Sequence, residues 1–220
     1  LFIPFDKDGA APIIDNCNDA GIPVICCNNI TSNVDAATAY VGANDIEAGI
    51  METEYIMELI DGKGNIAVVE GPFGHSAQVA RQEGLEQVLA EYPDCEIVLD
   101  DTANWNRDEA MELVENWLAG GTQIDAIICH NDIMAMGALQ ACQDAGLEIP
   151  IIGIDATYDA LCAVKDGTLS ADVYQDVYGQ AEEAFNVCMR ILNGEEFEKT
   201  NYVPFKLITQ ENVDEYLANF

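Results

Sequence analysis

Polar and planar side chains stand at the ends of most strands that the sequence predicts. The set contains a carboxylate, a guanidinium, imidazoles, amides and an indole. Carboxylates and amides exchange hydrogen bonds with vicinal hydroxyl groups, and an indole covers a C–H face. In open α/β sheets, ligands bind outside the carboxyl ends of the strands. The sequence therefore predicts a site for a polyhydroxylated small molecule, built from Asn28, His75, Arg81, Trp105, His130, Asn131, Asp155 and Gln175.

Catalytic motifs are missing from the sequence. It has no G-x-S-x-G elbow, P-loop, H-E-x-x-H or G-x-G-x-x-G motif, and its two histidines follow different strands without a serine or cysteine spaced for a triad. A metal site is the weaker interpretation, because each candidate ligand has a simpler role as a helix cap, turn residue or hydroxyl partner; the candidates are His75, His130, Asp132 and Asp155. We therefore expect a protein that is not an enzyme and that uses no cofactor or metal.

The stretch Ile124–Gly146 illustrates how the chain positions such residues. Its first six residues, ending at Cys129, are apolar apart from Asp125 and form a run too short for a helix, which is typical of a buried strand in a parallel sheet. Asp132 can cap the helix that follows, and apolar residues then recur at helical spacing until Gly146. This strand, turn and helix form half of a βαβ unit.

The same alternation of strand and helix runs through the whole chain, and it predicts one or two doubly wound α/β sheets. We expect the helix at residues 11–20 to bury Ile13, Ile14 and Cys17, and the helix at 179–192 to bury Ala181, Ala184, Phe185, Cys188, Ile191 and Leu192. The expected strands are residues 1–4, 22–27, 65–71, 95–101, 124–129, 149–155, 169–176 and 201–209.

Two of the candidate side chains have alternative roles. Arg81 is the first inward residue of a helix that Ser76 can cap, and an inward guanidinium needs either an internal carboxylate or a ligand as its partner. Trp105 lies in a turn between strand and helix, where its ring either faces a ligand or anchors the loop.

The composition limits the classes of partner. With 220 residues and 50% hydrophobic content, the chain can form one large domain or two modest lobes. Its 8 Lys and Arg against 40 Asp and Glu give a net charge of −32, which argues against binding to nucleic acid or an anionic membrane. The acidic residues are scattered, as on a solvated surface, and a neutral or cationic small partner stays open.

Eight cysteines form no C-x-x-C pair or metal-ligand spacing. Most of them sit on apolar stripes, so we expect buried free thiols rather than disulfides, which fits a reducing or anaerobic setting. The chain has no stretch of 18 apolar residues and no signal peptide, and it opens directly into an apparent strand. We expect it to be a fragment.

Several segments resemble the periplasmic sugar-binding proteins of ABC transporters, of the ribose, galactose and inositol type. They occur in the family's order and spacing: GIPVICCNN, GPFGHSAQVARQEG, TANWNRDEAMELVENWL, HNDIMAMGALQA, IIGIDATYDALCAVKDGTLSADVYQD and NYVPFKLIT. GHSAQVAR and TANWNRDEA look most like the inositol- or rhizopine-binding branch, and His75 is also similar to the galactose binders.

The resemblance implies a type I periplasmic-binding-protein fold, with two Rossmann-like, doubly wound α/β lobes that close on a sugar by hinge motion. Residues 1–42 and 175–201 would form part of the N-terminal lobe, and residues 43–174 and 202–220 the C-terminal lobe. The family's ligand contacts fall on Asn28, His75, Arg81, Trp105, Asn131, Asp155 and Gln175, which leaves His130 as a neighbour that faces away from the ligand.

The function that the resemblance implies is capture of a monosaccharide or cyclitol and its delivery to an ABC permease. The expected location is periplasmic or extracellular, including a membrane-tethered lipoprotein in the full-length form. The alternative is the ligand-sensing domain of a LacI-like transcriptional regulator, which shares the fold but which the charge of −32 disfavours.

The chain departs from the family in two places. Asn28-Asn29 stands where the family often has Asp-Arg, so a charged fork is replaced by amides. The opening strands and helices of the N-terminal lobe are also absent from this sequence. We expect the exposed strand edges that remain to favour self-association.

Overall fold

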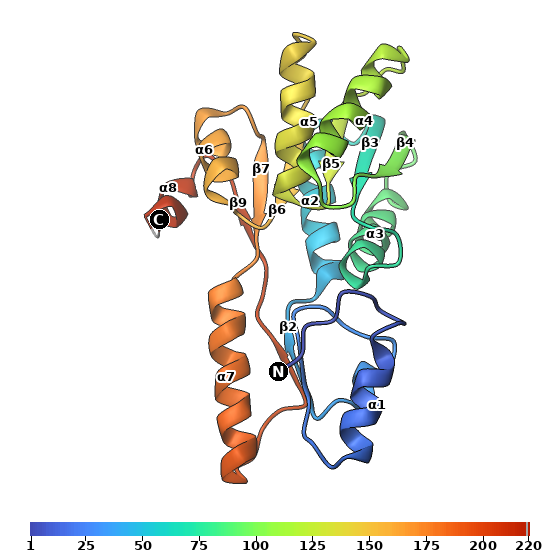
Figure 1. Cartoon of the computed structure of the whole chain (residues 1–220). Coiled ribbons are helices and arrows are strands. Elements are labelled where there is room, and N and C mark those ends of the chain that lie inside the picture. The colour runs from blue at the N-terminus through green and yellow to red at the C-terminus, as the bar shows by residue number, and fades with distance from the viewer. Residues whose placement is uncertain (219) are drawn as a thin grey trace. The chain divides into compact units, whose positions relative to one another are not determined.

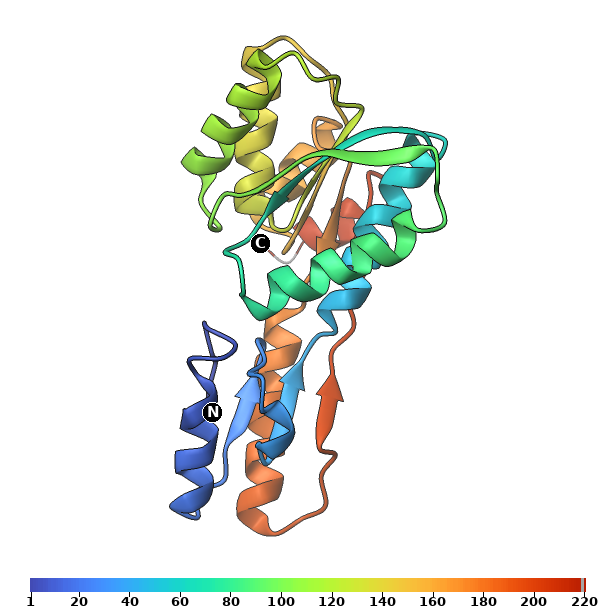
Figure 2. The same ribbon diagram turned by 90° about the vertical axis from the view of Figure 1, so that its right-hand side faces the viewer.

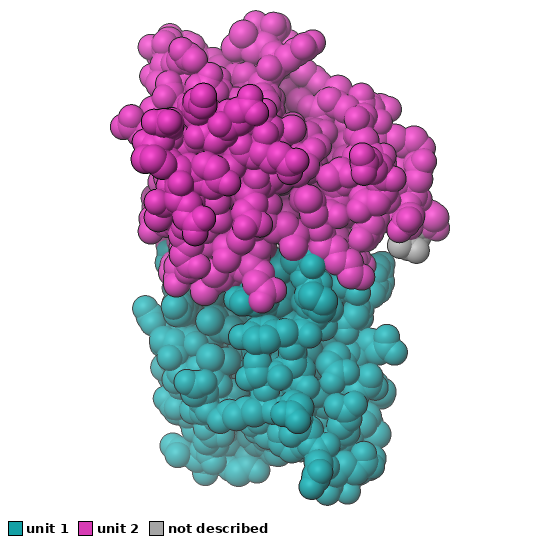
Figure 3. Space-filling model, turned by 180° about the vertical axis from the view of Figure 1, so that it is seen from behind, with its two compact units in different colours: residues 1–44, 74–77, 176–205 teal, residues 45–73, 78–175, 206–220 magenta. Residues whose placement is uncertain are grey.

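The computed structural model describes residues 1–218 and 220, and the chain divides into two compact units (Figure 3). Unit 1 comprises Leu1–Asn44, Gly74–Ala77 and Asp176–Phe205. Unit 2 comprises Asp45–Phe73, Gln78–Gln175 and Lys206–Phe220. Strands and helices alternate along the chain (Figure 1), which confirms the α/β class predicted from the sequence.

Unit 2 is organised around a six-stranded sheet in the order β4-β3-β5-β6-β7-β9. All neighbouring pairs are parallel except β7 and β9. Figure 2 shows α4 and α5 on one side of this sheet and α2 and α3 on the other. The strands are β3 (Gly64–Glu70), β4 (Cys95–Thr102), β5 (Ala126–Cys129), β6 (Ile151–Ile154), β7 (Ala171–Tyr174) and β9 (Lys206–Ile208).

The central strands of this sheet are apolar on both faces because helices cover both faces. Ile127, Ile128, Ile152 and Ile154 are fully buried, as the short apolar runs predicted. The helices of unit 2 are α2 (Asp45–Leu59), α3 (Ser76–Leu89, from residue 78 onward), α4 (Arg107–Ala119), α5 (Asp132–Asp144), α6 (Tyr158–Asp166) and α8 (Val213–Leu217).

Unit 1 contains a three-stranded parallel sheet in the order β1-β2-β8, formed by β1 (Ile25–Cys27), β2 (Ala39–Gly42) and β8 (Thr200–Tyr202). Helix α1 (Ala11–Asp19) packs Ile14 against one group of buried sheet residues, and α7 (Val177–Asn193) packs Ala184 and Val187 against another. A short 3-10 helix, η1 (Val34–Ala36), precedes β2.

Three strand predictions were wrong in detail. Residues 1–4 form no strand, and only Phe2 bridges to Cys26 of β1. Strand β2 was not predicted, because four residues ending in glycine give too short a pattern to recognise. The run 201–209 is two strands in different units, separated at residues 203–205, where Pro204 has no N–H for a ladder.

The predicted buried faces of two helices were also partly wrong. On α7, Phe185 is 61% and Leu192 73% exposed, and Ala181 is exposed too, whereas Gln180 and Val187 are buried instead. On α1, Ile14 is buried but Ile13 is exposed. The 3.6-residue period of a helix predicts a buried stripe, but residues that flank this stripe match the period nearly as well. The period alone therefore does not fix the edges of the buried face.

All eight cysteines carry free thiols, and Cys26, Cys27, Cys129 and Cys142 are buried. Burial raises the pKa of Cys129 well above its usual value and raises the pKa of Cys142 to about 11. These four thiols are therefore protonated and pack as small apolar groups, as predicted.

Helices α2 and α3 cross at two glycines. A Cβ at Gly49 would overlap the backbone carbonyl of Arg81, and a Cβ at Gly84 would overlap the carbonyl of Ile46. The missing side chains therefore let the backbone of Arg81 lie directly against α2.

We predict that Gly49→Ala lowers the free energy of unfolding by about 1–3 kcal/mol, because the new methyl group must push α3 away from α2. Urea unfolding followed by circular dichroism measures this change. Gly120→Ala is the matched control, since its Cβ would meet nothing nearer than 3.3 Å and its φ of −68° suits alanine. Equal stability of Gly49→Ala and the wild type would contradict the close crossing.

Candidate functional site

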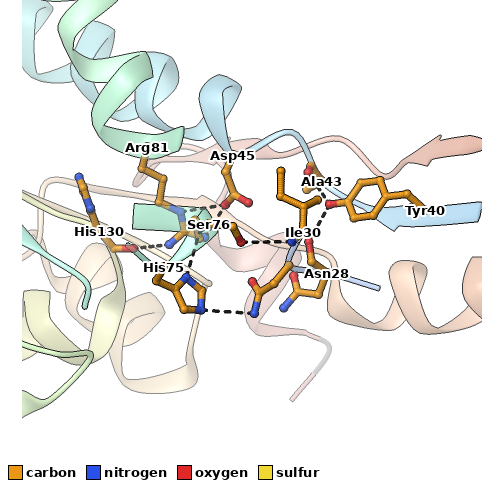
Figure 4. Close-up of polar contacts among 11 residues, drawn as sticks. Asn28, Ile30, Tyr40, Ala43, Asp45, His75, Ser76, Arg81 and His130 are labelled. Atoms are coloured by element: carbon orange, nitrogen blue, oxygen red, sulfur yellow. Dashed lines mark hydrogen bonds and ion pairs between the residues drawn. The ribbon is translucent and has the colours of Figure 1, made fainter. Parts of the chain in front are cut away.

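A buried arginine forms the centre of the polar group at the strand ends of unit 2. Arg81 is 4% exposed, and its Nε and Nη2 atoms lie 3.0 and 2.9 Å from Oδ1 of Asp45. Its Nη1 donates to the carbonyl oxygen of His130 (Figure 4), and its Cζ lies 5.8 Å from the centroid of the Trp105 ring. The internal ion pair, one of the two roles predicted for an inward arginine, is present, and contact with a ligand stays a prediction.

The charge of Arg81 is maintained by carboxylates. Burial alone would lower the pKa of the guanidinium, but Asp45, Asp155 and Glu52 outweigh this and raise it. The contacts with Asp45 and His130 use three of the five guanidinium N–H groups. A buried, charged and fixed donor of this kind suits recognition of hydroxyl oxygens.

Asp155 follows β6 in a strained turn. Its φ is 127° and that of Ala156 is 59°, two consecutive positive values at residues other than glycine. Burial raises the pKa of Asp155 to about 6, Arg81 opposes the shift, and Asp45 adds to it. Strain of this kind persists only where the surrounding structure imposes it, and it is a common mark of a binding site.

Asn131 caps helix α5, which corrects the prediction that Asp132 would do so. The Asn131 Oδ1 atom accepts a hydrogen bond from the backbone N–H of Met134 at 3.0 Å. Asp132 is the first residue within the helix, and its Oδ2 accepts from the N–H of Thr157 instead, at 2.7 Å. Because the cap engages the Asn131 oxygen, the NH₂ group of the same amide points away from the helix.

Trp105 and Gln175 complete the predicted residues in unit 2. Trp105 lies in the turn after β4 with a φ of 59°, and a Cβ at Gly71 would overlap its indole ring. The ring therefore packs on the Gly71 backbone beside the Arg81 guanidinium. Gln175 is buried directly after β7.

Asn28 and His75 belong to unit 1. Asn28 follows β1 with a φ of 60°, and its carbonyl oxygen accepts from the Tyr40 hydroxyl at 2.6 Å. His75 is buried, and its Nε2 lies 3.3 Å from Nδ2 of Asn29 (Figure 4). The ring of His75 also meets Phe5 edge to face, with the ring centroids 5.3 Å apart. The structure thus places the seven predicted residues in two groups, two in unit 1 and five in unit 2.

The start of α3 differs from the prediction. The helix begins at Ser76, and the N–H of Ala77 donates to Nδ1 of His75 at 3.2 Å. The Ser76 hydroxyl accepts from the N–H of Ile30 (Figure 4). His75 therefore takes the capping role that the sequence suggested for Ser76.

His130 contributes its backbone rather than its side chain. The imidazole is fully buried, and within residues 1–218 and 220 neither ring nitrogen has a hydrogen-bond partner. Figure 4 shows the ring directed away from Arg81 and the carbonyl directed towards it. Burial and the charge of Arg81 lower the pKa of His130 to about 3, so the ring is neutral.

The sequence prediction missed three carboxyl groups near this site: Glu52 and Asp172, which are fully buried, and Asp45, whose side chain is 11% exposed. Asp45 begins a helix, where an acidic residue is ordinary, and the other two sit within a helix and a strand. Their proximity to Arg81 or Asp155 depends on contacts between elements distant in sequence, so no local pattern indicates it.

Two searches of the described residues gave negative results. No group of three or more His, Cys, Asp or Glu side chains within 1–218 and 220 is arranged to hold a metal ion. No helix in the same residues has the length and apolar character required to cross a membrane.

Comparison with known proteins gives a consistent picture. Residues 1–196 match the periplasmic binding protein domain family. A protein of Rhizobium meliloti named as a rhizopine-binding protein is 37% identical over 221 residues, covering 97% of this chain and 72% of that protein. The xylitol-binding protein of Mycolicibacterium smegmatis is 36% identical over 216 residues, covering 97% of this chain and 62% of that protein.

A solved structure matches as well. An ABC transporter solute binding protein from Bacillus halodurans, with bound myo-inositol, is 42% identical with a TM-score of 0.94. The match covers 98% of this chain and 75% of that one. The chain thus spans between 62% and 75% of the length of these three proteins.

We predict that the ring C–H chemical shifts of His130 stay constant from about pH 8 to about pH 4.5, because the folded pKa is about 3. The unfolded chain takes up this proton at about pH 6.5, so His130 contributes stability above that pH and the contribution is lost as the pH falls towards 3. Proton–carbon NMR measures the shifts, and His75→Asn assigns the two signals. A midpoint near 6.5 would contradict the neutral buried ring.

Proposed function

Because the chain belongs to the periplasmic binding protein family, we propose that it is a solute-binding protein that captures a monosaccharide or cyclitol and delivers it to an ABC permease. It performs no chemistry on the ligand. The observation that carries the proposal is the group of Arg81, Trp105, Asn131 and Asp155 at the strand ends of unit 2, fixed by internal contacts.

The proposed ligand contacts use complementary chemistry. Arg81 donates to hydroxyl oxygens, Asp155 accepts from hydroxyl groups, and amides can do both. Trp105 offers an aromatic face to the C–H side of a ring. The full proposed set is Asn28 and His75 from unit 1 and Arg81, Trp105, Asn131, Asp155 and Gln175 from unit 2.

The electrostatics favour a neutral ligand. The positive charge of Arg81 is already paired with Asp45 and faces Asp155, so the group has no excess positive charge for an acid. Polyols and sugars are neutral and rich in hydroxyl groups, and relatives of this chain are named for xylitol and rhizopine or hold myo-inositol. These observations favour a cyclitol or polyol over a charged substrate.

Transport also fits the relatives better than gene regulation does. The similar solved structure is an ABC transporter component, and none of the three relatives described above is named as a transcriptional regulator. We place the protein in the periplasm or at the outer cell surface, with an ABC permease as its partner.

Calorimetric titration tests the proposal. We expect saturable heat with at least one of myo-inositol, xylitol, galactose, glucose and ribose, and no heat with any of them would contradict it. Asp155→Ala should weaken binding at least about 100-fold, because charge-assisted hydrogen bonds contribute about 1.5–3 kcal/mol each and a carboxylate forms at least two.

His130→Ala serves as the matched control for the site. It removes a fully buried ring but keeps the backbone carbonyl that accepts from Arg81. We expect the affinity of this variant to stay within about threefold of the wild type after correction for the folded fraction. Equal losses from both substitutions would mean that the pocket lies elsewhere.

We also propose that unit 1 self-associates. Tyr178, Phe185 and Leu192 recur every seven residues on α7 and are 83%, 61% and 73% exposed. Leu1, Ile3 and Phe5 are exposed as well, beside the edge of β1. An apolar stripe of this kind is unusual on a monomer and favours contact with a second apolar surface.

Light scattering after size exclusion tests the self-association. We expect the mass to rise with protein concentration and Phe185→Glu to shift the protein towards the monomer, because a buried charge would oppose the contact. Leu147→Glu, at an exposed apolar residue of unit 2, is the control and should change nothing. A monomer at every concentration would contradict the proposal.

A further inference from the structure

The turn that carries Asp155 is held by two buried carboxyl groups. The N–H of Ala156 donates to Oδ1 of Asp172 at 3.1 Å, and the N–H of Thr157 donates to Oδ2 of Asp132 at 2.7 Å. Asp132 and Asp172 are both fully buried. Two consecutive donors of a strained turn are therefore fixed by side chains from two other elements, α5 and β7.

A glycine brings these two carboxyl groups together. Gly153 on β6 pairs directly with Asp172 on β7. A Cβ at Gly153 would lie 2.5 Å from Oδ1 of Asp132 and 3.0 Å from the side chain of Ala135. The absence of a side chain at Gly153 therefore lets the Asp132 carboxyl group reach the sheet beside Asp172.

The other oxygen of each carboxyl group accepts no hydrogen bond from the described residues. Within residues 1–218 and 220, neither Oδ1 of Asp132 nor Oδ2 of Asp172 accepts from another group. Both oxygens belong to side chains that meet at Gly153, so two buried carboxyl groups lie together with one oxygen of each left without a donor. Ionised carboxylates only accept hydrogen bonds, so a proton on one of the two groups would supply the missing donor.

The surroundings favour that proton. Asp155 adds negative charge to the pair from the β6–α6 turn. Glu52 on α2 is also buried, and burial and Asp172 raise its pKa. Of the cations on this side of unit 2, Arg81 on α3 is paired with Asp45, and Arg107 on α4, which lines the same pocket as Asp132, is exposed. The neighbouring groups at the end of β5 are Cys129, whose thiol is protonated, and His130, whose ring is neutral.

The pKa values of the pair agree with this geometry. Burial raises the pKa of Asp132 well above its usual value, and Asp172 and Asp155 add to the shift. Burial also raises the pKa of Asp172 to about 7. Because the two groups titrate as a coupled pair, the protonation state belongs to the pair rather than to either residue.

We propose that Asp132 and Asp172 share one proton and act as a positioning pair that holds the Asp155 turn in its binding conformation. The proposal rests on the proposed function, in which Asp155 contacts the ligand. Neither member of the pair touches the ligand. Their role is to fix the backbone N–H groups of residues 156 and 157 and thereby the direction of the Asp155 side chain.

The shared proton has a measurable effect on stability. The unfolded aspartates release their protons at about pH 3.9, whereas in the folded state the pKa of Asp172 is about 7 and that of Asp132 is well above its usual value. The folded state therefore binds more protons in this range, and the contribution to stability is present below pH 3.9 and lost as the pH rises to 7.

Asp172→Asn removes the carboxyl group that binds a proton but keeps an acceptor and a donor at the same position. The amide oxygen can still accept from Ala156, and its NH₂ group can donate to Asp132 without a bound proton. We expect the number of protons taken up on folding between about pH 4 and pH 7 to fall by about one, measured from thermal unfolding across this range. Asp166→Asn, at an exposed position of α6, should leave the uptake unchanged.

Ligand affinity tests the positioning role. Asp172→Asn should bind myo-inositol, or whichever sugar the wild type binds, within about threefold of the wild type at pH 7, and Asp172→Ala should bind at least about tenfold more weakly because Ala156 loses its acceptor. Wild-type affinity in Asp172→Ala would overturn the positioning role. Unchanged proton uptake in Asp172→Asn would overturn the shared proton.

Two further features keep the outcomes distinct. The thermal measurements need no ligand, so a wild type that binds no sugar would refute the proposed function and leave the result on the proton intact. If Asp172→Asn does not fold, Asp132→Asn replaces it, since its amide can accept from Thr157 and donate to Asp172. The same reduction of about one proton is expected, and its absence would overturn the proposal.

Discussion

The ion pair between Arg81 and Asp45 is the interaction on which the rest of unit 2's polar site depends. A guanidinium this deeply buried is stable only when carboxylates and hydrogen-bond acceptors surround it. Asp45 compensates its charge, the His130 carbonyl fixes one nitrogen and the Trp105 ring lies against the group. The glycine crossing of α2 and α3 places the Arg81 backbone where this arrangement can form.

The acidity of the interior follows from the same constraint. One guanidinium cannot neutralise Asp45, Glu52, Asp132, Asp155 and Asp172 together, so several of these groups keep protons near neutral pH. The site therefore carries little net charge even though the whole chain carries −32. A nearly neutral interior lined with hydrogen-bonding groups is suited to polyhydroxylated, uncharged molecules.

Several errors in the sequence predictions share one physical origin. Asn131 and Asp132 are adjacent and both can cap a helix, so the choice depended on Thr157, which offers Asp132 a different donor. Which face of α7 is buried depends on the sheet residues that lie opposite it. The helical period alone did not show that Val187 is buried and Phe185 exposed. Strand β2 was too short for its pattern to be distinguished from a loop.

The sequence by itself determined the α/β class, the positions of most helices and strands, and the placement of polar residues after the parallel strands. Apolar runs, helix breakers and helical spacing are local signals, so they can be recognised without the tertiary structure. It also identified the residues that stand at those strand ends. Only the tertiary structure decided that Arg81 pairs with Asp45, that His130 contributes a carbonyl rather than a ring, and that Asp132 meets Asp172 across Gly153. These contacts join elements up to about 50 residues apart, and their energy depends on burial that no local pattern encodes.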